Sequence, residues 1–173
     1  MNSIKSSFES TFQGTSEDGT TFSSTLNIDW NGEDEQSSDF FVDFVNVVQD
    51  SDGNNIEGAN GKVDEIGNTN SDRIQIKVGR ESEQIGRTGS HEIGHSGDEH
   101  HPDLQKQQDL WGYPLQSDNI MYPSDNSTRG TITPFQLNRI SNTVLNGYSK
   151  PPQSMQKMPM KKIDKIDLVH DKN

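Results

Sequence analysis

The sequence predicts one α+β domain, and three observations lead to this fold class. Apolar and polar residues alternate over residues 26–30 and 73–79, which is the period of a β-strand with one buried face. Elsewhere apolar residues recur every three or four positions, as they do in amphipathic helices. A chain of 173 residues is long enough for one domain and short for two. We expect this domain to span residues 1–150, and the polar segment 151–173 to be a disordered tail.

The first half of the chain is expected to hold one helix and three strands. A short helix is predicted where apolar residues recur every four positions before a glycine, at Ile4, Phe8, Phe12 and Gly14. A strand with one buried face is predicted over residues 21–30. The segment FFVDFVNVV, residues 40–48, is apolar on both faces and is expected to be a central strand, followed by a loop over 49–72. The outward residues of RIQIKVG, residues 73–79, are polar and partly basic, which is typical of an edge strand.

The second half is expected to hold two helices joined by an irregular segment. The first helix is predicted over residues 82–96, and residues 97–132 are rich in glycine and proline. The second helix begins with a capping box in TPFQ, where Thr133 is the N-cap and Gln136 follows three residues later. Its apolar stripe and its glycine stop are Leu137, Ile140, Val144, Leu145 and Gly147.

Composition excludes several classes of function. The net charge of −12 argues against nucleic acid or an anionic membrane as a partner. The chain has no cysteine, which rules out disulfides and thiolate zinc sites. Hydrophobic residues make up only 27% of the chain, so a bound metal would help to stabilise a thin core. The N-terminus lacks the apolar stretch of a signal peptide, so we expect export by another route or a domain cut from a longer protein.

The segment HEIGHSGDEHH, residues 91–101, contains four of the five histidines. Residues four apart lie on one face of a helix, so His91 and His95 can bind one metal ion. Glu92 projects about 100° away and can reach a water on the open side of that metal, as a general base must. Catalytic zinc usually takes a third protein ligand. No glutamate follows Glu99 in the sequence, whereas histidines stand at positions 100 and 101.

The same segment resembles the metzincin motif H-E-x-x-H-x-x-G-x-x-H, with Asp98 in place of the glycine and Gly97 one position early. His100 would be the third ligand if Gly97 made the turn, and His101 if spacing from the helix governs. Aspartate tolerates the left-handed conformation better than most residues, at a cost of about 1–2 kcal/mol that is small against zinc binding. We therefore predict His101 as the ligand and a positive φ at Asp98.

DNIMYP, residues 118–123, resembles the Met-turn of metzincins, most closely that of the matrixins. The resemblance implies that Met121 forms the floor of the site without binding the metal, and that Tyr122 and Pro123 line the substrate pocket. It also implies a twisted mixed β-sheet above the active-site helix and a C-terminal helix below. The histidine segment is also similar to metallopeptidase domains of bacterial Rhs-repeat toxins.

These observations predict a zinc-dependent endopeptidase in which Glu92 is the general base. We expect an extended substrate to pair with the strand that contains Ile74, Ile76 and Val78. The expected partners are a peptide or protein substrate and, if the toxin likeness holds, a cognate inhibitor or immunity protein. We expect a monomer that is secreted or delivered outside the producing cell.

Two alternatives remain open at this point. One is a zinc-stabilised binding module without catalysis, in which Asp98 or His100 supplies a fourth ligand. The retained Glu92 favours the enzyme. The other concerns DSDGNN, residues 50–55, which begins like a calcium loop. An EF-hand would need glycine at Asn55 and glutamate at Gly61, so a solvated turn is the preferred interpretation and a different kind of Ca2+ site the alternative.

Overall fold

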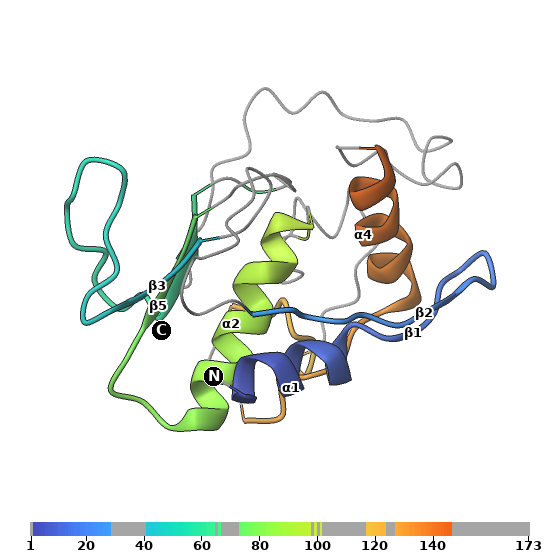
Figure 1. Ribbon diagram of the computed structural model, residues 1–173, viewed down its shortest axis with the longest axis horizontal. Coiled ribbons are helices and arrows are strands. Elements are labelled where there is room, and N and C mark those ends of the chain that lie inside the picture. The colour runs from blue at the N-terminus through green and yellow to red at the C-terminus, as the bar shows by residue number, and fades with distance from the viewer. Residues whose placement is uncertain are drawn as a thin grey trace.

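The computed structural model combines helices with β-sheets, as the sequence predicts (Figure 1). It describes residues 2–28, 41–64, 66, 73–97, 99, 101, 117–123 and 127–146. The elements in chain order are α1 (Asn2–Thr11), β1 (Gly14–Thr15), β2 (Thr21–Phe22), β3 (Phe41–Val45), β4 (Gly61–Val63), β5 (Arg73–Lys77), α2 (Ser82–Ser96) and α4 (Pro134–Asn146). The tail 151–173 lies outside the described residues.

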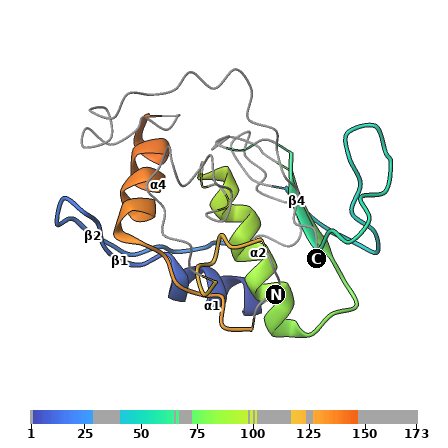
Figure 2. The same cartoon turned by 180° about the vertical axis from the view of Figure 1, so that it is seen from behind.

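Helix α2 lies at the centre of the described structure. It stands between the β3–β5–β4 sheet and α4 in two opposite views (Figures 1 and 2), and it contacts α1, β4 and β5. Neighbouring elements come closest to the backbone of α2 at its glycines. Gly86 and Gly89 face Ser3 and Ile4 of α1, while Gly94 faces Met121. Gly97, just after the helix, faces Ile140 of α4. Glycine in a helix interior costs up to about 1 kcal/mol, and here it lets the surrounding elements approach the helix backbone.

Helix α1 connects two hydrophobic clusters. At its start, Ile4 packs with Val63 of β4 and with Ile74 and Ile76 of β5. At its end, Phe12 packs with Ile120 and Met121, and Ile132 and Ile140 lie against this second cluster. The predicted helix with apolar residues every four positions is confirmed. Its apolar side ties the sheet to the segment that carries Met121.

The described sheet has the order β3–β5–β4, which corrects one prediction. β5 pairs in parallel with β3 on one side and antiparallel with β4 on the other. β5 is therefore the central strand of the described sheet, and its prediction as an edge strand is wrong. β3 pairs only with β5 among the described strands, so its prediction as a central strand stays a prediction. The physical reason for the error at β5 is β4, a three-residue strand inside the segment that was expected to be a loop.

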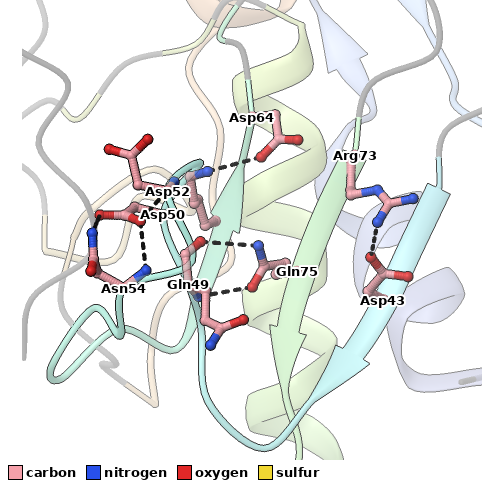
Figure 3. Close-up of polar contacts among 9 residues, drawn as sticks. Asp43, Gln49, Asp50, Asp52, Asn54, Asp64, Arg73 and Gln75 are labelled. Carbon is pink, nitrogen blue, oxygen red and sulfur yellow. Dashed lines mark hydrogen bonds and ion pairs between the residues drawn. The ribbon is translucent and has the colours of Figure 1, made fainter.

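Polar side chains of the sheet bond to neighbouring strands and turns (Figure 3). Arg73 of β5 forms an ion pair with Asp43 of β3 at 3.1 Å. The side-chain amide of Gln75 accepts from the backbone N–H of Gln49 and donates to its carbonyl. The polar residues of β5 thus lie on an open face of the sheet. An open face and an open edge have the same signature in the sequence, which explains the wrong prediction.

The turn at residues 50–55 is closed by its own hydrogen bonds (Figure 3). Asp50 Oδ1 accepts from the backbone N–H groups of Asp52 and Asn54, and Oδ2 accepts from the side-chain amide of Asn54. The bonds from the Asn54 backbone and side chain hold the pKa of Asp50 below its usual value. These contacts match the predicted solvated turn.

The remaining predicted elements agree with the structure in part. α2 spans the residues expected for it, and α4 begins with the predicted capping box between Thr133 and Gln136. The strand predicted over 21–30 is shorter, because the backbone N–H and C=O of Leu26 bond to Glu9 and Lys5 of α1. None of the described helices is long and apolar enough to cross a membrane.

The contact between α1 and α2 predicts the effect of Gly86→Ala. An alanine Cβ would lie 2.6 Å from the backbone oxygen of Ser3, so α1 must move away from α2. Overpacking costs about 1–3 kcal/mol, whereas alanine gains up to about 1 kcal/mol over glycine from helix propensity alone. We expect a lower free energy of unfolding in urea. The control is Gly130→Ala, where a Cβ meets no atom within 4 Å. A more stable Gly86→Ala protein would contradict this packing.

Candidate metal centre

Three histidines converge in the interior beside α2. His91 and His95 stand one turn apart on the helix, and His101 follows its C-terminal end. Their exposed fractions are 0%, 6% and 2%. Each of the three Nε2 atoms lies 3.1 Å from the other two. The spacing H-x-x-x-H on a helix places the first two rings, and the chain beyond the helix supplies the third.

Backbone carbonyl groups fix the orientation of two of these rings. His91 Nδ1 lies 2.8 Å from the carbonyl oxygen of Ile120, and His95 Nδ1 lies 2.6 Å from that of Glu99. A carbonyl oxygen can only accept, so Nδ1 carries the proton in both rings. Nε2 of each neutral ring then bears a lone pair directed at the other two rings. Metal-binding histidines are commonly oriented in this way.

The environment keeps His91 neutral. Burial holds the pKa of His91 well below its usual value, and the positive charge of Arg129 and the other two histidines lower it further. The hydrogen bond to Ile120 acts in the opposite direction. A neutral imidazole is the form that binds a metal ion.

The donor set fits a metal ion of the size of zinc. Tetrahedral zinc with Zn–N bonds of about 2.0–2.1 Å requires nitrogen atoms about 3.3–3.4 Å apart, close to the observed separation. Two lone pairs at 3.1 Å cannot hydrogen-bond to each other, whereas a cation between them removes their repulsion. His91, His95 and His101 therefore form a buried cluster that can hold a metal ion.

Met121 and the residues around it lie directly against this cluster. Met121 is fully buried, and its sulfur packs against Gly94, the residue before His95. The segment closes on itself through Ile120 N–H, which donates to Thr131, and through the Gly130 and Thr131 N–H groups, which donate to Asp118. The floor position that the Met-turn likeness implies is thus adjacent to the cluster.

The Glu92 side chain lies against β4. Its side chain is 2% exposed, and a Cβ built on Gly61 would lie 2.6 Å from Oε1 and 2.8 Å from Cγ. The same Cβ would lie 2.7 Å from Thr88, one turn earlier on α2. Only glycine fits at position 61 without displacing the carboxylate. Gly61 thus lets the backbone of β4 lie on Glu92.

The other predicted site residues are less closely grouped. Ile74 and Ile76 are fully buried in the core, and both edges of β5 are paired, so the predicted addition of a substrate strand to β5 is wrong. Val78 is half-buried, and its N–H donates to Val45. Tyr122 and Pro123 are half-buried directly after Met121.

The turn after α2 is described only in part. Gly97 has φ −79°, outside the left-handed region. Its N–H and that of Glu99 donate to carbonyls of the last turn, those of Ile93 and Gly94. Asp98 and His100 lie outside the described residues, so the predicted positive φ of Asp98 stays a prediction.

Comparison with known proteins gives no independent assignment. Neither protein-family models nor curated proteins match this chain.

Three residues near the cluster escape prediction from sequence. Gly61 stands in an expected loop, and its role depends on a close approach that no local pattern reveals. Arg129 is buried, and one of its NH groups donates to the carbonyl of Tyr122. Asn119 is buried beside Met121 and bonds to Gln136, which the sequence assigns only to a capping box. In the sequence, the one sign that Asn119 is buried is its position directly before the apolar residues Ile120 and Met121.

The cluster predicts a difference between two adjacent histidines. His101→Ala removes one of three converging nitrogens and should weaken zinc binding by more than about 100-fold, since even residues behind the ligands contribute 10–100-fold. His100→Ala is the matched control and should retain zinc. Competition with a chromophoric chelator measures both affinities. Loss of zinc from His100→Ala alone would contradict the assignment.

Proposed function

We propose that this protein is a zinc-dependent endopeptidase of metzincin type. The observation that carries the proposal is the convergence of His91, His95 and His101 beside a buried Glu92. Three imidazoles form a ligand set found in catalytic zinc sites, which leave a coordination position for water or substrate. The H-E-x-x-H spacing and the I-M-Y-P sequence at Met121 support peptide hydrolysis over other zinc-dependent reactions.

The chain's own residues divide the chemistry between them. His91, His95 and His101 would hold the zinc ion, which would supply an acidified water molecule and a polarised substrate carbonyl. His91 and His95 present Nε2 because their Nδ1–H groups donate to backbone carbonyls. Glu92 accepts the proton of the attacking water on its carboxylate and passes it to the leaving amine. Tyr122 and Pro123, half-buried beyond Met121, are the residues that we assign to the substrate pocket wall.

The burial of Glu92 supports the enzyme over a structural zinc module. A closed site needs four ligands and no general base. A buried carboxylate on the residue next to the first ligand is where H-E-x-x-H enzymes carry their general base, and a purely structural site has no use for one there. The structural module requires Asp98 or His100 as a fourth ligand, and the His100→Ala protein tests part of that requirement directly.

The decisive test is Glu92→Gln. The substitution preserves shape and removes the basic carboxylate, so the zinc-loaded variant should lose activity by about 10²–10⁴-fold. The assay follows cleavage of an unfolded protein, with zinc content measured on the same sample and a chelator abolishing wild-type cleavage. Glu83→Gln is the control, because Glu83 is an exposed carboxylate of the same helix. Full activity of zinc-loaded Glu92→Gln would end the proposal.

The contact with Gly61 predicts a second kinetic signature. In Gly61→Ala the new Cβ must displace the Glu92 carboxylate, which lies within 2.6 Å of its position. Misplacement by about 1 Å can cost about 100-fold in rate, so we expect a loss in kcat of that order. Zinc affinity should be unchanged, because the three atoms nearest to the new Cβ belong to Glu92 and Thr88 and not to a histidine. An unchanged kcat would show that the position of Glu92 does not matter.

A further inference from the structure

A pair of buried amide side chains joins α4 to the segment that carries Met121. Asn119 Nδ2 donates to Gln136 Oε1 at 2.7 Å, and Gln136 Nε2 donates to Asn119 Oδ1 at 3.2 Å. Asn119 is 2% exposed and Gln136 is fully buried. Buried polar groups of this kind are costly unless every one is bonded. The pair is therefore a specific connection between the two segments.

Backbone groups fix which way each amide faces. Asn119 Oδ1 also accepts from the N–H of Met121 at 2.9 Å, and Gln136 Oε1 also accepts from the N–H of Thr133 at 2.9 Å. Each oxygen must therefore be an acceptor, and the two amides cannot exchange their oxygen and nitrogen positions. The capping box of α4 thus sets the orientation of Gln136, and Gln136 sets that of Asn119.

The bond to Met121 continues to the metal cluster through one peptide group. The N–H of Met121 and the carbonyl of Ile120 belong to the same planar unit, so fixing one fixes the other. Asn119 holds the N–H side of this plane, and the carbonyl side accepts from His91 Nδ1 at 2.8 Å. A rotation of the plane would move the acceptor away from the imidazole.

We propose that Asn119 and Gln136 are positioning residues of the metal site, through which the N-terminus of α4 sets the orientation of His91. The proposal rests on the metal site of the proposed function and adds residues that touch neither metal nor substrate. Partners that orient metal ligands commonly contribute about 10–100-fold to metal affinity. The amide pair acts one step further out, by fixing the peptide group that is such a partner.

The first test compares the zinc affinities of two single variants, their double variant and a control. Asn119→Ala and Gln136→Leu both break the pair and should each weaken zinc binding by about tenfold or more. The double variant should bind zinc about as tightly as the single variant with the lower zinc affinity, because both substitutions break the same connection. Thr143→Ala is the control, since Thr143 is a buried residue of α4 whose hydroxyl donates within the helix, to Arg139. The spectrum of bound Co2+ should change in the first two variants and stay as in the wild type in Thr143→Ala.

A second measurement uses the unmodified protein and does not depend on the variants folding. Coupling is reciprocal, so zinc should stabilise the amide pair as much as the pair stabilises zinc. Zinc loading should slow hydrogen exchange of the Met121 N–H and of the Asn119 and Gln136 side-chain amides more than that of the Thr143 N–H. Equal slowing at all four, or zinc affinities equal to that of Thr143→Ala, would overturn the inference. A wild-type protein that binds no zinc would instead overturn the metal site itself.

Discussion

The convergence of three imidazole nitrogens in the protein interior is the constraint on which the rest of this structure depends. Two of the rings carry lone pairs 3.1 Å apart, because their protons are committed to the carbonyls of Ile120 and Glu99. Such a cluster is unfavourable unless a cation occupies its centre, and desolvation prevents His91 from relieving the repulsion by protonation. Both carbonyl acceptors follow α2 in sequence: Glu99 lies directly after the helix, and Ile120 lies in the segment that carries Met121. Holding them in place requires both segments to pack tightly on α2.

The neighbouring segments pack tightly on α2 because they lie close to its backbone, and less because large apolar side chains fill the space between them. The chain has 27% hydrophobic residues, and its central helix carries glycines at three interior positions. Each glycine gives up helix propensity, about 1 kcal/mol or less, and admits a neighbour that a larger residue would exclude. Gly94 admits the sulfur of Met121, the residue that follows Ile120. The glycines thus help to bring the Ile120 carbonyl within hydrogen-bonding distance of His91.

The sequence patterns predicted the features that depend on periodicity within one element. They missed the features that depend on contacts with other strands and segments. The bounds of α2, the pairing of His91 with His95 and the capping box of α4 follow from spacing within one helix. The position of β5 depends on β4, whose three residues are all buried and too few to show the period of a strand. Arg73 and Gln75 suggested an open edge, whereas Asp43 and Gln49 bond to them across an open face. The bond between Asn119 and Gln136 joins residues 17 apart in sequence, and neither residue type alone indicates a partner.

The groups proposed for catalysis are positioned by two different parts of the chain. The Glu92 carboxylate lies against β4 and depends on the missing side chain of Gly61, whereas His91 depends on Ile120 and, through the amide pair, on α4. The two supports meet at α2, which carries both residues on neighbouring positions, and α1 packs against both supports. On the proposed mechanism, we therefore expect a substitution on the β4 side to change proton transfer while the ligands stay in place. We expect a substitution on the α4 side to change metal binding while the carboxylate stays in place. A displacement of α2 would affect both groups, because this helix carries His91 and Glu92.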